Sequence, residues 1–370
     1  MSGTPTSSTD LASQHPAAQL PWLTSRRCLL GLLVAVTTLA GAFLMLRILE
    51  GGGLTPLRGG ILILFTLTFA WIALAFWSAV FGLVVAALEA TSRSLIDTGE
   101  AHHFEAFVLS DTTDTDIAED EGRQIAELQQ RLKGDLTLHY RRRTDNRGRK
   151  AGNIAEFCRR WGRRYDFMVV LDADSRMEGK TLLALVRAMQ ARPSVGLIQT
   201  VPLPARQITL FGRLAEFAAS LYAPILAAGQ SSWQGDTANY WGHNAILRVS
   251  AFMDHGGLPV LPGRPPLGGE ILSHDFVEAA LLRRGGWEVQ LEARIRGSFE
   301  EMPGNLLDFA RRDRRWTQGN LQHLRLLDVP ELHGMNRLHF LLGAMAFLSS
   351  LLWLGVLVAG SLDAMLHSPQ

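Results

Sequence analysis

The chain has 370 residues, of which 47% are apolar, and a formal net charge of +1. This length allows one domain of ordinary size with accessory elements, and so small a net charge excludes a general attraction to nucleic acid. The two cysteines, Cys28 and Cys158, lie in an apolar run and within a predicted helix, so no disulfide framework is indicated.

Membrane helices are the strongest coarse signal at both ends of the chain. Residues 1–25 lack an apolar period and are expected to be disordered. Three apolar runs without charges follow: Cys28–Leu46, Ile61–Leu88 and Phe340–Leu362. A helix needs about 20 such residues to cross the hydrocarbon layer, and buried core helices are rarely uncharged on every face. We expect two membrane helices within residues 26–88 and a third within 339–370.

The charges that flank these runs favour one orientation. Arg26 and Arg27 precede the first run, the middle segment is rich in arginine, and no Lys or Arg follows Leu362. A signal peptide is the alternative for the first run, but the next apolar run follows closely and no small-residue cleavage site stands out. The pattern predicts a cytoplasmic N-terminus and middle segment and an outward C-terminus.

Helical and strand-like patterns alternate over residues 89–300. Strands are predicted at "HFEAFVLS", "LTLHYRR", "DFMVVLD" and "VGLIQT", and helices at "DIAEDEGRQIAELQQRLKG", "AGNIAEFCRRWG" and "GKTLLALVRAMQARP". This alternation predicts an α/β domain around a mainly parallel sheet.

Acidic residues directly follow two of the predicted strands. Asp111 follows "AFVLS" and Asp172 follows "MVVL". Ligands of open parallel sheets bind outside the carboxyl ends of strands, although either acid alone could be a helix N-cap. Asp172 and Asp174 share one face in extended backbone, where two like charges repel unless a cation lies between them. The pair suits Mg²⁺ or Mn²⁺, which also bind substrate phosphates.

A basic segment, Tyr140–Asn153, comes before the second of these acids. Lys150 and Asn153 lie at a predicted helix start, where ammonium and backbone N–H groups suit phosphate. A solvated loop and an RNA-binding segment are the alternatives, but no run of aromatic residues is interleaved with the basic ones as RNA binding would favour.

Two segments later in the chain contain further candidate site residues. Asp275 lies in the first turn of a predicted helix within Ile271–Trp287, where an acid is also favourable without any catalytic role. His243 follows Gly242, and because a lone histidine is more often structural, we expect a structural role.

An arginine cluster within residues 301–338 contains Arg312 and Arg315 and ends at Trp316. Guanidinium forks suit diphosphate and an indole face suits a sugar. The alternative is a basic helix at the membrane surface.

Together these segments resemble the membrane-bound family 2 glycosyltransferases, which include cellulose and hyaluronan synthases. The strongest resemblance is to the glucans biosynthesis glucosyltransferase H family. It is carried by "VLSDTTDTDIA", "RKAGNIAEFCRRWG", "VVLDADS", "YWGHNAI", "ILSHDFVEAAL" and "RRDRRW" between about residues 88 and 362. The resemblance implies a GT-A-like domain inserted between transmembrane helices of the cell inner membrane, with the catalytic domain in the cytoplasm.

The resemblance also implies a reaction, which is inverting transfer of glucose from UDP-glucose onto a β-glucan of the osmoregulated periplasmic type. The implied partners are the glucan acceptor, the lipid bilayer and periplasmic glucan-processing proteins, without nucleic acid. Asp275 would be the general base, and Asp172 and Asp174 would hold the metal. The implied donor-binding residues are Asp111, Lys150, Asn153, Asp172, Arg312, Arg315 and Trp316.

The chain departs from the family pattern before the first acid. The second apolar run continues through "VFGLVVAALEATSRSL" into the next predicted helix, without the proline-x-tyrosine-asparagine-glutamate-like strand end that borders the nucleotide base in the family. The family also continues with several further spans. Two hypotheses follow: an active membrane-bound glucosyltransferase, or a non-catalytic remnant or scaffold that lacks one strand of the sheet.

Overall fold

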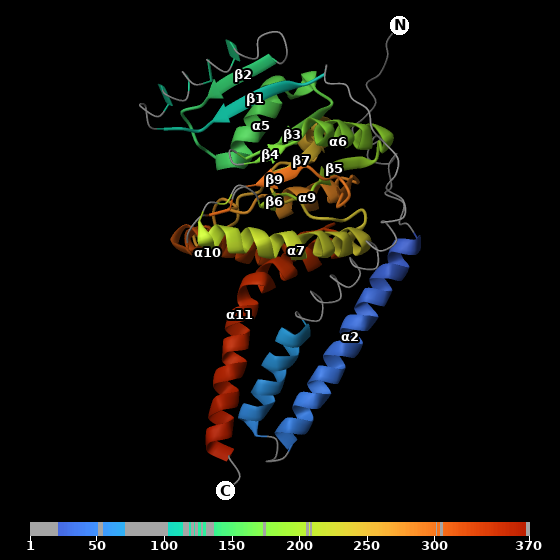
Figure 1. Ribbon diagram of the computed structural model, residues 1–370, viewed down its shortest axis with the longest axis vertical. Coiled ribbons are helices and arrows are strands. Elements are labelled where there is room, and N and C mark those ends of the chain that lie inside the picture. Colours follow the sequence, from blue (N-terminus) through green and yellow to red (C-terminus); the bar gives the residue numbers. More distant parts are fainter. Residues whose placement is uncertain are drawn as a thin grey trace.

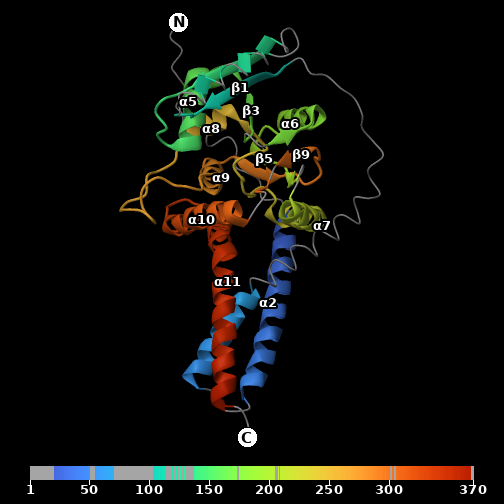
Figure 2. The same cartoon turned by 60° about the vertical axis from the view of Figure 1, so that its left-hand side comes forward.

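The computed structural model describes residues 21–50, 55–70, 103–113, 137–172, 175–204, 209–300 and 306–367, together with a few isolated positions. An α/β part lies at one end, and long helices leave it at the other (Figures 1 and 2). The predicted helix after "AFVLS" lies largely outside the described residues, as does the predicted junction near Ala86.

The largest sheet has four strands in the order β3-β7-β5-β8. Their bounds are β3 Phe167–Val170, β7 Ala245–Arg248, β5 Val195–Gln199 and β8 Glu288–Leu291. β7 is antiparallel to both of its neighbours, and only β5 and β8 are parallel. The prediction of a mainly parallel sheet is therefore wrong for this sheet, because β7, which no sequence pattern had assigned, enters between β3 and β5.

Side chains of this sheet alternate between two apolar clusters, as the two-residue period of a strand requires. Leu197 and Leu247 pack with residues of α5 (Arg149–Trp161), α8 (Val249–His255) and α9 (Asp275–Arg284). Ile198 and Ile246 pack on the other face with α6 (Gly179–Ala191). Helices therefore cover both faces, which confirms an α/β layer arrangement.

A second sheet contains only β1 (Glu105–Ser110) and β2 (Thr137–Arg142), paired in parallel. Its Phe107 ring lies 4.8 Å from Phe157 and 5.9 Å from Trp161 between ring centroids, so the sheet packs on α5. No other strand that the structure describes pairs with β1. A third, small sheet has the order β4-β9-β6, with β4 Arg176–Met177, β9 Ser298–Glu300 and β6 Leu203–Pro204.

The legs of the molecule are α2 (Pro21–Glu50), the helix Pro56–Ala70 and α11 (Gly334–His367). α2 begins inside the tail that was predicted to be disordered to residue 25, and it contains the first predicted span. α11 contains the third predicted span and is long and apolar enough to cross a membrane. The second predicted span, Ile61–Leu88, is described only to Ala70.

A buried ion pair joins these legs. The Arg58 Nε donates to both carboxylate oxygens of Asp363 at 2.7 and 3.0 Å, and its Nη1 donates to the Leu49 carbonyl at 3.2 Å. His367 adds a contact to Asp363 at 3.1 Å. The side chains of Arg58 and Asp363 are only 6% and 12% exposed, so the pair links α2, the Pro56–Ala70 helix and α11 away from water.

Two helices, α7 (Leu210–Gln234) and α10 (Leu306–His323), run across the domain end of the legs (Figures 1 and 2). The two helices touch through Phe211 and Phe309, whose ring centroids are 5.9 Å apart. α7, like α11, is long and apolar enough to cross a membrane. Its exposed leucine and phenylalanine side chains lie along one stripe: Leu210, Leu214, Phe217 and Leu221. That one-sided exposure is typical of a helix lying on an apolar surface.

Candidate functional site

The beginning of α5 connects the acidic residues of the candidate site. Lys150 forms an ion pair with Asp172, which follows β3. Asn153, three residues later and therefore on the same side of the helix, donates to the Asp111 carboxylate at 2.8 Å and to the Leu109 carbonyl at 3.0 Å. The two acids belong to two separate sheets and not to one sheet edge as predicted, but α5 contacts both.

Asp111 is held by more than Asn153. Arg143 donates to both of its carboxylate oxygens, at 2.5 and 2.8 Å. This hydrogen-bonded pairing with Asp111 raises the pKa of the Arg143 guanidinium. A carboxylate offers about four lone-pair positions, so Asp111 keeps capacity for one more donor.

Asp172 lies in a tight turn, and its side chain is accessible to solvent. The Ser175 amide donates to the Asp172 carbonyl at 3.0 Å, and the Asp172 amide donates to the Ser175 hydroxyl at 3.1 Å. The Asp172 side chain is 38% exposed. Asp174, the second predicted metal ligand, lies outside the described residues. The accessible Asp172 carboxylate offers the oxygen ligands that a hard divalent cation prefers, but the described part of the chain contains no group of three or more acidic, histidine or cysteine side chains placed to hold one.

His243, for which a structural role was predicted, lies beside this turn. Its Nδ1 is 3.1 Å from the Ser175 hydroxyl, and its Nε2 is 3.3 Å from a Glu300 carboxylate oxygen. The backbone around it is unusual, since Gly242 has φ 88° and Asn244 has φ 52°. A non-glycine residue at positive φ is uncommon and clusters at functional sites. The Gly-His-Asn sequence was the available signal for this loop.

Asp275 begins α9, as predicted, and accepts a hydrogen bond from the Ser273 hydroxyl at 2.6 Å. A Cβ placed on Gly242 would lie 3.6 Å from the Asp275 Cβ, so the His243 loop runs directly past this acid. The loop therefore lies between Asp275 on one side and the Asp172 turn on the other.

The neighbours of Asp275 are buried and titratable. Burial is the main cause that raises the pKa of Tyr240, whose hydroxyl donates to the Gly242 carbonyl at 2.8 Å. Burial alone would lower the pKa of His274, but the Glu278 carboxylate at 3.0 Å and Asp275 outweigh it, so this pKa is raised. These neighbours of Asp275 are therefore shielded from water, which strengthens the electrostatic interactions among them.

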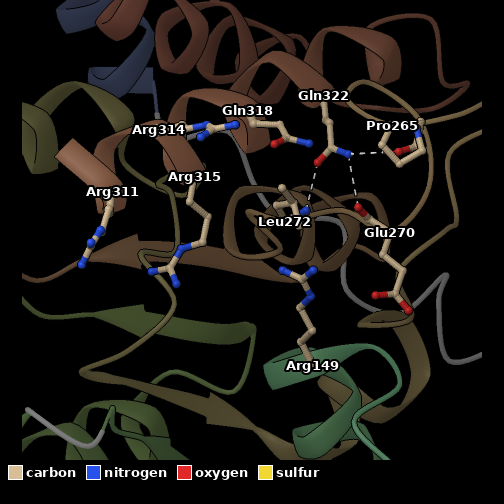
Figure 3. A pocket seen from close by; sticks show the side chains of 10 residues that line it. Arg149, Pro265, Glu270, Leu272, Arg311, Arg314, Arg315, Gln318 and Gln322 are labelled. Atoms are coloured by element: carbon tan, nitrogen blue, oxygen red, sulfur yellow. Dashed lines mark hydrogen bonds between the residues drawn. The ribbon is translucent and has the colours of Figure 1, made fainter. Parts of the chain in front are cut away.

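An arginine-rich cavity of about 540 Å³ borders the start of α5. Figure 3 shows Arg149 from α5 and Arg315 from α10 approaching it from opposite sides. The complete lining is Arg149, Pro265, Gly268, Glu270, Leu272, Arg311, Arg314, Arg315, Gln318 and Gln322. Four guanidinium groups against one carboxylate favour an anionic ligand.

Of the three residues predicted in α10, only Arg315 lines this cavity. Arg312 instead stacks on Trp316, with its Cζ 4.5 Å from the ring centroid, and it also lies 5.5 Å from the Phe309 ring. Arg149 and Glu270 were missed, because nothing local in the sequence places them at the same cavity. Glu270 reaches α5 by accepting a hydrogen bond from the Gly148 amide at 3.2 Å.

Comparison with known proteins defines the class. Residues 167–367, more than half of the chain, match the family described as "Glycosyl transferase family group 2". The chain therefore belongs to this family, whose members contain a GT-A-type domain, consistent with the mixed α/β architecture.

Several curated relatives carry one name, "Glucans biosynthesis glucosyltransferase H". A Rhodopseudomonas palustris relative is 47% identical over 97% of this chain and 54% of its own length. A Vibrio cholerae relative is 44% identical over 90% of this chain and 50% of its own, and a Shewanella baltica relative is 45% identical over 85% and 48%. This chain thus spans about half the length of the relatives it matches.

Proposed function

We propose that the chain is an inverting glucosyltransferase that uses UDP-glucose to elongate the β-glucan backbone of osmoregulated periplasmic glucans. The family membership supports glycosyl transfer, and the names of the relatives support glucan synthesis. The observation that carries the proposal is the start of α5, which contacts Asp111 through Asn153 and Asp172 through Lys150 beside an arginine-lined cavity. Carboxylates, an ammonium group and arginines at one place suit a nucleoside diphosphate.

Donor binding is assigned to residues around α5 and α10. Asp111 and Asn153 would hold the uridine, for which Asp111 keeps one free acceptor position. Lys150 and Arg315 would contact the diphosphate, with Arg312 and Trp316 packed together below the acceptor. When bound, Mg²⁺ or Mn²⁺ would be held by Asp172 and Asp174 and would neutralise charge on the diphosphate.

Transfer is assigned to Asp275. Its carboxylate accepts the proton of an acceptor hydroxyl while that oxygen forms a bond to the glucose anomeric carbon. The bond from that carbon to the diphosphate oxygen breaks, and UDP leaves with the electron pair. A single displacement inverts the anomeric configuration. A base must lie within hydrogen-bond reach of the proton it takes, and Asp275 borders the loop that reaches the Asp172 turn.

The cell inner membrane is the proposed location, with the α/β part in the cytoplasm. α11 would span the bilayer with the N-terminal helices, and the α7 stripe with Leu306 and Leu307 of α10 would lie on its surface. The glucan acceptor and periplasmic glucan-processing proteins are the proposed partners, and no nucleic acid is expected.

Metal-dependent donor binding tests the proposal. We expect the purified full chain in lipid nanodiscs to bind UDP-glucose in the presence of Mn²⁺. Removal of the ion with a chelator should weaken binding, because the Asp172 charge would then repel the diphosphate. Titration calorimetry measures both states, with GDP-glucose as the control nucleotide. Absence of UDP-glucose binding with Mn²⁺ present would refute the assignment.

A second candidate, a non-catalytic remnant or scaffold of the same family, is favoured by the strand arrangement. Among the described strands, β1 pairs only with β2 and β3 pairs only with β7, so each has one side that no described strand occupies. The match to the Rhodopseudomonas palustris relative also extends over 401 residues, more than this chain contains. A sheet edge without its partner exposes backbone groups and removes a wall beside β1.

Restoring the strand distinguishes the two candidates. Insertion of a relative's strand segment near Ala86 should raise UDP-glucose affinity and turnover if an unpaired β1 limits binding. Titration calorimetry and a UDP-release assay provide the measurements, and an inserted Gly-Ser linker of equal length is the control. Tight, Mn²⁺-dependent binding by the original chain would instead eliminate the remnant hypothesis.

A further inference from the structure

Arg143, at the end of β2, is a buried arginine to which no role has been assigned; it is 8% exposed. Besides Asp111, its guanidinium donates to the carbonyl oxygens of Arg147 at 3.1 Å and Arg149 at 2.7 Å. Its backbone amide donates to the Ser110 carbonyl at 3.1 Å. One residue thus joins the end of β1 to the loop that leads into α5.

The loop adopts a conformation that needs support. Gly148 has φ 69° and Arg149 has φ 48°, so two successive residues are left-handed and one of them is not glycine. Such a residue costs of order 1–3 kcal/mol and persists only where its surroundings impose it. A Cβ on residue 152 would collide with the Arg147 carbonyl. Because residue 152 is glycine, that carbonyl has room to accept the hydrogen bond from Arg143.

The residues that this loop positions belong to or border the proposed nucleotide-sugar site. Lys150 follows directly and pairs with Asp172, while Arg149 lines the arginine cavity. We propose that Arg143 is a positioning residue for nucleotide-sugar binding. It orients Asp111 and holds the loop so that Lys150 and Arg149 are in place before the ligand arrives. This inference rests on the proposed function.

Only arginine can perform this role. Its planar fork presents five N–H donors in fixed directions, and here they reach a carboxylate and two carbonyls together. A lysine keeps the charge but is a compact ammonium with three donors, so it can pair with Asp111 without also fixing both carbonyls. Arg143→Lys therefore separates positioning from simple charge neutralisation.

The first experiment compares Arg143→Lys with the wild-type chain in lipid nanodiscs. We expect UDP affinity in Mn²⁺ to fall about tenfold or more, the scale of a lost hydrogen bond to a charged group. Amide hydrogen exchange should accelerate across residues 144–153 and remain unchanged in β5. Arg160→Gln is the matched control, because Arg160 lies in the last turn of α5 and its side chain is 56% exposed in its pair with Glu156 at 2.8 Å. It should change neither readout.

A double-mutant cycle with Lys150→Ala tests whether Arg143 acts through the loop. If it does, Arg143→Lys should weaken UDP binding much less in the Lys150→Ala background, because residues that act through one another are not additive. Fully additive losses would overturn the proposal and indicate a merely structural arginine. Unchanged loop exchange would overturn it too. Failure of the wild-type chain to bind UDP would refute the proposed function, whereas loop exchange would still decide whether Arg143 holds the loop.

Discussion

Asp275→Asn is expected to abolish glucosyl transfer while leaving UDP-glucose affinity nearly unchanged. The amide is almost the same size and can still accept from Ser273, which lies 2.6 Å away, so α9 should keep its start. It cannot take a proton, and general base catalysis contributes about 10²–10⁴-fold to rate. Titration calorimetry gives the affinity and UDP release gives the turnover.

Two comparisons decide the role of Asp275. Ser273→Ala removes the hydrogen bond to the carboxylate but keeps the base, so we expect it to retain most of the activity. An interaction made only in the transition state lowers turnover without weakening substrate binding. Equal losses of affinity and turnover in Asp275→Asn would show that the acid is a structural residue at the start of α9.

Asp363→Leu is expected to produce the largest loss of stability. It leaves the Arg58 guanidinium, 6% exposed, without the carboxylate that it contacts at 2.7 Å. Removing one partner of a buried ion pair costs about 3–5 kcal/mol, because the remaining charge is buried without compensation. Thermal unfolding in detergent should show a clearly lower midpoint, and limited proteolysis should cut the legs faster.

The double variant Arg58→Met/Asp363→Leu separates the pair from its surroundings. We expect it to recover much of the lost stability, since replacing both partners by apolar residues is often neutral. Lys180→Gln is the surface control, because Lys180 is 81% exposed in its pair with Glu178 and such pairs contribute about 0–1 kcal/mol. A double variant as unstable as Asp363→Leu would show that the ion pair itself is needed.

Much of the α/β layering could be predicted from local pattern alone. β1, β2, β3 and β5 and the helices α5 and α6 lie where apolar runs and helix signals predicted them. β7 was missed because its four residues give too short a periodic signal, and its antiparallel pairing depends on two strands distant in sequence. α7 was missed because it does not lie in a charge-free run: Arg213 and Glu216 are in its first turns.

The candidate site was predicted as a set of residues but not as an arrangement. Lys150, Asn153, Asp111 and Asp172 do meet, yet the connection runs through α5 and not along one sheet edge. His243 contacts Ser175 and Glu300, which are both distant from it in the sequence. A side chain's neighbours depend on packing, which one residue and its flanks do not encode.

Local sequence patterns were sufficient to locate most of the strands and helices around the site and the acids that follow or begin them. A short apolar run indicates a buried strand, and an acidic residue is favourable in the first turn of a helix. Asp172 after β3 and Asp275 at the start of α9 could therefore be located from nearby residues alone. The residues that those acids contact depend instead on long-range packing. Arg143 reaches Asp111 across 32 positions, Glu270 reaches Gly148 across 122, and Arg58 reaches Asp363 across 305. Contacts at such separations form because burial of the apolar faces fixes the layers, and the polar side chains then pair with whatever the packed layers bring within hydrogen-bond distance.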